Sequence, residues 1–125
     1  MLPILILLAG LLLGPADVRA EGPATVFLEE LTSTELAARI KAGATTVIIP
    51  VGGTEQNGPH MVLGKHNVRA KVLSEQIARA LGNALVAPVM AYVPEGSVQP
   101  PTGHMRYPGT ITVPPDVYRK VLESS

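Results

Sequence analysis

Apolar positions form two kinds of pattern along this chain. Between Val68 and Leu81 they recur every three or four positions, which is the spacing of one face of an α-helix. Thr45–Val51 is instead a continuous apolar and β-branched run, and Ala84–Val89 is a second, shorter apolar run. Continuous runs of this length are typical of strands that are covered on both faces, as in a parallel sheet.

Capping residues mark the ends of the predicted helices. Ser33 or Thr34 can cap a first helix, which Gly43 ends. Gly82 follows the helical pattern that begins at Val68 and ends that helix in the same way. The order helix, strand, loop, helix, strand predicts a layered α/β domain with right-handed crossovers between parallel strands.

The segment from Val93 to Pro115 has a different composition, with six prolines and three glycines. Its aromatic and charged side chains are more typical of an ordered surface loop than of a linker. Within it we predict a brief strand at Thr110–Val113. A third helix is predicted over Asp116–Glu123, with Pro115 in its first turn.

The amino-terminal residues have the pattern of a secretory signal. Leu2–Leu13 is almost wholly apolar, and Val18-Arg19-Ala20 offers small or modest side chains to a signal peptidase. A bilayer span needs roughly 20 apolar residues, and this run is shorter, so an uncleaved anchor is the less favoured alternative. We therefore predict a signal peptide at residues 1–20, a periplasmic or secreted domain at residues 21–125, and no stable membrane insertion after cleavage.

The overall charge and the absence of cysteine exclude several classes of partner and of metal ligand. The 125 residues include ten basic and ten acidic side chains, so no field of one sign is available to attract nucleic acid or anionic lipid. The chain has no cysteine, which excludes disulfides and thiolate ligands. Any metal site must therefore use His, Asp, Glu or Asn side chains.

Candidate metal ligands gather in the polar loop after the first predicted strand. Glu55, His60 and His66 lie within this loop, and His104 lies in the proline-rich segment. Ligands of α/β sheets bind beyond the carboxyl ends of strands, and carboxylate and imidazole groups are ligands of zinc and similar ions. By spacing alone this signal is weak, because histidines in a surface loop are more often solvated side chains that bind nothing.

Two sequence motifs resemble those of the creatininase family. Residues 49–60 read I-P-V-G-G-T-E-Q-N-G-P-H, similar to the family's signature P-V-G-S-T-E-Q-H-G-P-H. Residues 104–111 read H-M-R-Y-P-G-T-I, similar to the family's H-M-x-F-P-G-T-I. The resemblance extends over residues 27–125 and implies a three-layer α/β/α fold with a mostly parallel sheet, often assembled as a homo-oligomer.

The resemblance also implies an activity and a set of ligands. Family members hydrolyse non-peptide C–N bonds in small cyclic or linear amides, using divalent zinc or manganese to activate water. Their glutamate ligand falls on Glu55, their histidine ligand on Asn57 and their bridging aspartate on His66. Asn binds transition metals poorly, and a neutral imidazole has one lone pair and cannot bridge two ions. Either one ion is held by Glu55 and His66, with help from His60, or metal binding has been lost.

Four further residues are candidates for substrate binding. Gly52 and Gly53 lack side chains, so their backbone amides could approach a substrate closely or could only form a tight turn. His104 and Arg106 could bind a substrate carboxylate, or could belong to a surface loop or a subunit contact. Lys65 would repel a bound cation, so we expect it to point to solvent. No side chain is singled out as catalytic.

Family members run to about twice this length, and their remaining ligands lie in an Asn-Gly-His loop that these 125 residues do not contain. We therefore expect the amino-terminal half of a creatininase-type amidohydrolase, inactive by itself. One alternative is a non-catalytic protein that binds a metal or a small molecule. Another is a remnant that does not fold alone, because half of a parallel sheet leaves an uncovered edge.

Overall fold

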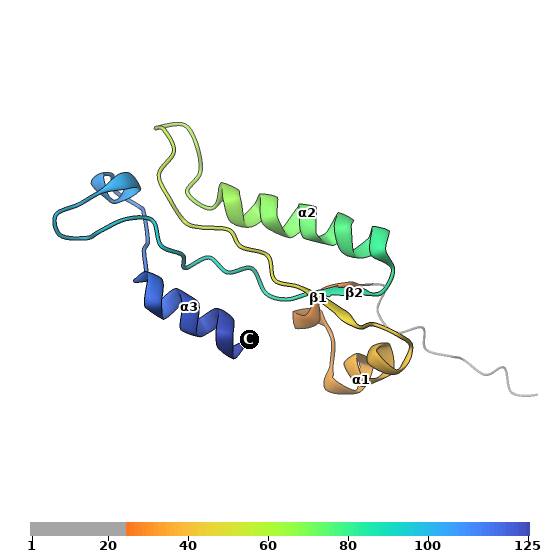
Figure 1. Ribbon diagram of the computed structural model, residues 1–125. Coiled ribbons are helices and arrows are strands. Elements are labelled where there is room, and N and C mark those ends of the chain that lie inside the picture. The colour runs from red at the N-terminus through yellow and green to blue at the C-terminus, as the bar shows by residue number, and fades with distance from the viewer. Residues whose placement is uncertain (1–24) are drawn as a thin grey trace, which may run out of the picture.

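The computed structural model describes residues 25–125 (Figure 1). In chain order the elements are η1 (Leu28–Glu30), α1 (Ser33–Lys41), β1 (Thr46–Ile48), α2 (Lys65–Leu81), β2 (Ala84–Val86), η2 (Gly103–Arg106) and α3 (Pro115–Ser124). The signal peptide predicted for residues 1–20 lies outside the described residues. Within residues 25–125, no helix combines the length and apolar character needed to cross a membrane.

Helix α1 begins with a capping box. The hydroxyl of Thr32 accepts a hydrogen bond from the backbone N–H of Glu35, and the Glu35 carboxylate accepts one from the N–H of Thr32 at 2.8 Å. The prediction of Ser33 or Thr34 as the cap was therefore wrong by one or two positions, because both residues already lie in the helix. The box satisfies two of the N–H groups that a helix start leaves without a partner.

Replacing Thr32 with alanine is expected to destabilise the protein by about 1 kcal/mol, because the capping hydroxyl is lost. The matched control is Thr34→Ala, which changes a threonine inside the first turn and should cost under about 0.5 kcal/mol. Urea denaturation of the two variants measures the difference. Equal losses would show that the hydroxyl of Thr32 does not stabilise the helix.

Strands β1 and β2 pair in parallel, as the apolar runs predict, with Ile48 opposite Val86. Further along, Val51 pairs with Met90, so the second strand uses one residue more than the first between these two pairs. The extra residue is a bulge. Pro50 and Pro88 lie in this interval and lack an N–H to donate. The regular strands are therefore shorter than the predicted runs.

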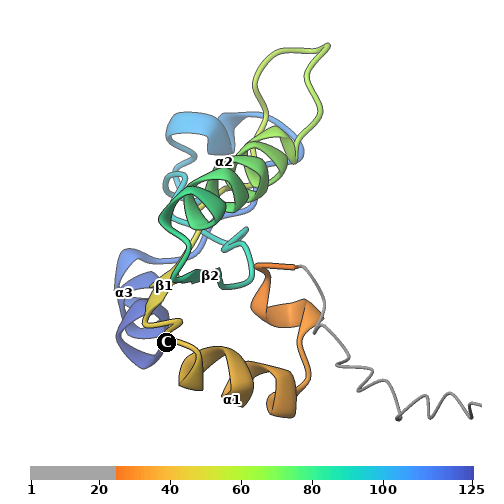
Figure 2. The same cartoon turned by 90° about the vertical axis from the view of Figure 1, so that its right-hand side faces the viewer.

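Helices cover both sides of the strand pair (Figures 1 and 2). Helix α2 lies on one side, and helices α1 and α3 lie on the other. The α/β fold with a parallel sheet is therefore confirmed. The core lies between α2 and the strands, where Ala78 of α2 and Val86 of β2 are almost completely buried. The core cluster comprises Val26, Phe27, Ala78, Ala84 and Val86, with Ile48 packed against it.

The proline-rich segment differs from its prediction in one respect. Residues 110–113 do not form a strand, because their backbone hydrogen bonds go to two different segments. The N–H of Ile111 donates to the carbonyl of Thr54 at 2.9 Å, whereas that of Val113 donates to the carbonyl of Val93 at 3.3 Å. These bonds hold the segment against the loops that follow both strands.

Candidate functional site

Gly52 and Gly53 position the loop that follows β1. The N–H of Gly52 donates to the carbonyl of Met90 at 3.0 Å, and the N–H of Gly53 donates to the Asn67 side chain at 2.9 Å. A β-carbon on Gly52 would lie 2.1 Å from Oδ1 of Asn67, and Gly53 has a φ of +138°. Both amides are used inside the protein, so the structure favours their structural role over substrate binding. The loop then carries Glu55 into the interior.

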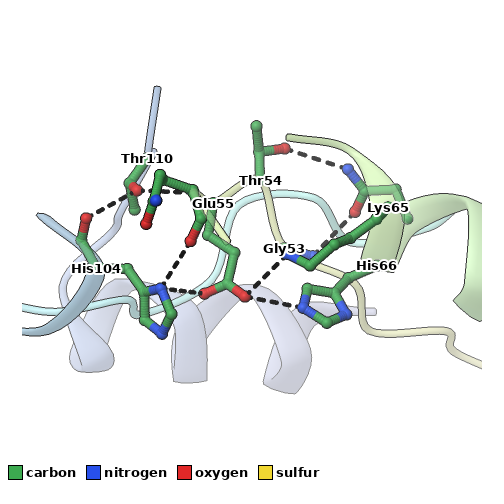
Figure 3. A network of polar contacts seen from close by, with 9 residues as sticks. Gly53, Thr54, Glu55, Lys65, His66, His104 and Thr110 are labelled. Atoms are coloured by element: carbon green, nitrogen blue, oxygen red, sulfur yellow. Dashed lines mark hydrogen bonds and ion pairs between the residues drawn. The ribbon is translucent and has the colours of Figure 1, made fainter. Parts of the chain in front are cut away.

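The carboxylate of Glu55 is the centre of a polar cluster (Figure 3). The residue is 6% exposed. Its Oε1 lies 2.8 Å from Nε2 of His66 and 3.3 Å from Nζ of Lys65. Its Oε2 lies 3.3 Å from Nδ1 of His104. Two imidazoles therefore flank one buried carboxylate, and the ammonium group of Lys65 contacts the same carboxylate oxygen as His66.

A second carboxyl group, that of Glu95, also contacts Glu55. Burial raises the pKa of Glu55, but hydrogen bonds from Glu95, Lys65 and His66 outweigh it and lower this pKa to about 2. The pKa of Glu95 is raised by burial and by its hydrogen bond to Glu55 and repulsion from it. When the two carboxyl groups hold one proton between them, that proton therefore lies on Glu95 rather than on Glu55.

The backbone near His104 fixes the tautomer of its ring. Its Nδ1 lies 2.9 Å from the carbonyl oxygen of Gln56. A carbonyl oxygen can only accept, so Nδ1 carries a proton. In the neutral ring the other nitrogen, Nε2, is then an acceptor. Thr110 supports this arrangement, because its hydroxyl donates to the carbonyl of His104 at 2.9 Å and accepts from the N–H of Gln56.

Three of the other predicted site residues make no hydrogen bond or ion pair with the Glu55 carboxylate. Asn57, His60 and Arg106 are exposed. The His60 ring lies near Gly58 in the outer part of the loop. Asn57 shares a shallow cavity of about 390 Å³ with His104 and four other residues. The structure thus brings together Glu55, His66 and His104, and does not bring Asn57, His60 or Arg106 to the carboxylate.

The expectation that Lys65 points to solvent was wrong. Its side chain is 15% exposed and directed at Glu55, because a buried carboxylate without an opposite charge is unfavourable. Sequence reasoning also missed Glu95 and Asn67. Glu95 follows β2 as Glu55 follows β1, and the carboxyl ends of adjacent parallel strands meet at one edge, so its position after the second strand was a usable signal. Nothing in the sequence marked Asn67.

The donor groups around Glu55 have the right chemistry for a divalent ion but are few. Carboxylate oxygen and imidazole nitrogen are ligands of zinc and manganese, and Glu55 and His66 are in contact. Among residues 25–125, no three His, Asp or Glu side chains are arranged as a metal site. The described residues can therefore supply two ligands, Glu55 and His66, to one ion. A cavity of about 490 Å³, larger than the one lined by Asn57 and His104, lies around Val26 and Ala84 and includes no residue of this cluster.

The fold and this cluster define a layered α/β protein whose polar residues meet beyond the ends of two parallel strands. A family model for creatininase, described as creatinine amidohydrolase, matches residues 29–125. The chain therefore belongs to the creatininase family, which is a family of hydrolases.

Several relatives and structures are similar to this chain. It is 35% identical over 89 residues to creatinine amidohydrolase of Pseudomonas putida, covering 71% of this chain and 34% of that protein. It is 29% identical over 105 residues to 3-dehydro-scyllo-inosose hydrolase of Thermotoga maritima, covering 83% and 31%. A manganese creatininase structure matches with a TM-score of 0.69 and 29% identity, covering 80% of this chain and 38% of that one. The chain thus spans about a third of the length of these relatives.

Proposed function

We propose that the protein is a metal-dependent amidohydrolase that cleaves a non-peptide C–N bond in a small cyclic or linear amide. The observation that carries the proposal is the buried Glu55 carboxylate in contact with His66 and His104. Two relatives support hydrolysis of a small molecule, since one is named for creatinine and another for an inosose, whereas a third is named as a peptidase of the mycofactocin precursor peptide. Creatininase structures in manganese and zinc forms support the choice of metal.

In this proposal Glu55 and His66 hold one divalent ion, and further ligands come from outside the described residues. The ion, when bound, supplies a Lewis acid that polarises the amide carbonyl and activates water. His66 would bind the ion through Nε2 in place of its present hydrogen bond to Glu55, once the ring proton has moved from Nε2 to Nδ1 through solvent. The hydrogen bonds from Glu95 and Lys65 help to lower the pKa of Glu55 and so favour the ionised form of this ligand.

His104 is suited to handle a proton near the ion. Because its Nδ1 donates to Gln56, Nε2 has a free lone pair that can accept a proton from water or from the substrate. His104 also lines the cavity of about 390 Å³, together with Asn57 and Tyr107. A small amide bound in this cavity would lie beside His104, whose ring contacts the Glu55 carboxylate.

The experiment that tests the proposal is metal analysis of the complete protein, followed by hydrolysis of creatinine as a cyclic amide probe. We expect about one zinc or manganese ion per chain, lost in Glu55→Ala and in His66→Ala. The matched control is His60→Ala, which removes an exposed histidine of the same loop and should retain the metal. If the unchanged protein and its three variants all lacked metal, the proposal would be contradicted.

A second candidate is a non-catalytic protein that binds a metal or a small molecule. The contact between Lys65 and Glu55 favours its small-molecule form, because an ammonium group already neutralises the carboxylate that a metal ion would need. Metal bound in stoichiometric amounts, without hydrolysis of any cyclic or linear amide tested, would favour this second function. For either function we propose export, on the basis of the apolar segment Leu2–Leu13.

A further inference from the structure

Lys65 has an unusual position for a lysine at the start of a helix. It is the first residue of α2, yet its side chain folds back onto the loop after β1 and is 15% exposed. Lysine is almost never buried to this extent without a partner. Here the partner is Oε1 of Glu55, at 3.3 Å from Nζ.

The same oxygen, Oε1 of Glu55, also contacts His66. Two neighbouring groups can therefore donate a hydrogen bond to it. Nε2 of His66 lies 2.8 Å from it, and a carboxylate oxygen has two lone pairs to offer. An ion that binds Oε1 must therefore displace one or both donors. His66 can exchange its hydrogen bond for a metal bond, because a neutral imidazole can carry its single proton on Nδ1 instead and leave the lone pair on Nε2. The ammonium group of Lys65 has none and can only be displaced.

We propose that Lys65 is an internal counter-ion that competes with the divalent ion for Glu55 and so sets the metal affinity of the site. The inference rests on the proposed function, since it concerns the same ion. Two positive charges near one partly buried oxygen repel strongly, because little water screens them. Lys65 therefore weakens metal binding, and it also keeps the metal-free protein folded by neutralising the buried carboxylate.

The test is calorimetric titration of the complete, metal-free protein with Zn²⁺ and with Mn²⁺. In Lys65→Met we expect binding that is tighter by about tenfold or more, because the competing charge is gone. The matched control is Lys71→Met. Lys71 lies on the same helix, but its side chain is 44% exposed and its Nζ lies 3.5 Å from Glu29. This control should bind both ions as the unchanged protein does.

Thermal unfolding gives a readout that does not depend on activity. Metal-free Lys65→Met should have a lower Tm than the unchanged protein, because Glu55 is left buried without a counter-charge. Zinc should then raise its Tm by more than it raises that of the unchanged protein, because the ion binds the folded variant more tightly. If Lys65→Met does not fold, Lys65→Gln, which keeps a donor without the charge, takes its place. Lys65→Arg, which keeps the charge, should retain weak binding.

The two proposals fail in different ways. If the unchanged protein and Lys65→Met bind zinc with equal affinity, the counter-ion role is overturned and the metal site stands. If Lys65→Met binds zinc more weakly, Lys65 supports the site rather than competing for it, and the inference is again overturned. If neither protein binds zinc or manganese, both the inference and the proposed function are overturned.

Discussion

Replacing Glu55 with glutamine is expected to lower the free energy of unfolding of the metal-free protein by about 3 kcal/mol. Glutamine keeps the shape of the side chain but removes its charge, so the ammonium group of Lys65 is left buried without a counter-charge. The control is Glu75→Gln on the surface of α2, where Glu75 pairs with Arg79 at 2.8 Å and both side chains are more exposed. Its loss should be under about 1 kcal/mol.

Urea denaturation at several pH values checks this result and its cause. The folded-state pKa of Glu55 is lowered to about 2, so its contribution is fully present above its unfolded pKa and is lost as the pH falls through the folded pKa. The difference between the unchanged protein and Glu55→Gln should therefore shrink as the pH falls from about 5 to about 2. A difference that stays constant over this range would contradict an ionised Glu55 as the source.

The double variant Glu55→Gln with Lys65→Met separates the lost pair from a general disruption of the loop. Removing both charges leaves neither of them buried alone, so the double variant should recover most of the lost stability. Losses of stability that simply add would instead show that Glu55 acts independently of Lys65.

Glu95 has the opposite pH dependence. Its pKa is raised in the folded state, so its contribution to the stability is lost as the pH rises through the folded value.

Replacing Gly52 with alanine is expected to destabilise the protein by about 3 kcal/mol, because there is no room for a β-carbon. The added atom would lie 2.1 Å from Oδ1 and 2.9 Å from Cα of Asn67. A side-chain oxygen can move, but the Cα belongs to the first turn of α2 and moves only with the helix. Such a shift would also disturb the contact between His66 and Glu55.

The matched control for Gly52→Ala lies in the same loop. Gly64 has a φ of −88°, and a β-carbon there would meet only Nδ2 of Asn67, at 3.9 Å. Gly64→Ala should therefore cost less than about 1 kcal/mol, mainly through its position at the helix start. Urea denaturation compares the two variants. Equal stability would show that the approach of the loop to α2 is not tight.

Much of the fold could be predicted from local patterns. The apolar runs identified both strands, and Gly82 ends α2 with a φ of +76° as predicted. The predicted strand at residues 110–113 was wrong because a strand depends on which segments accept its hydrogen bonds, and sequence does not reveal this. Thr32 was missed as a cap because three adjacent residues, Thr32, Ser33 and Thr34, all carry the hydroxyl that a cap needs.

The candidate site could be predicted only in part, for a related reason. Glu55 and His66 lie near one strand and one helix start, so local reasoning finds them. Glu95 approaches Glu55 only because β2 pairs with β1 in this register. The position of Lys65 was predicted wrongly because a cation was assumed to be bound beside it. In the folded chain Lys65 itself supplies the positive charge next to the Glu55 carboxylate.

The placement of helices on opposite sides of the strand pair explains why two carboxyl groups meet. The loop after β1 leads to α2 on one side, and the loop after β2 leads to α3 on the other (Figure 2). Two adjacent strands whose loops part in this way form a topological switch point, and open α/β sheets in general bind ligands beyond the strand ends at such a point. Glu55 and Glu95 come from the two diverging loops. Substitutions in either loop can therefore change the surroundings of these two carboxyl groups without altering the strands.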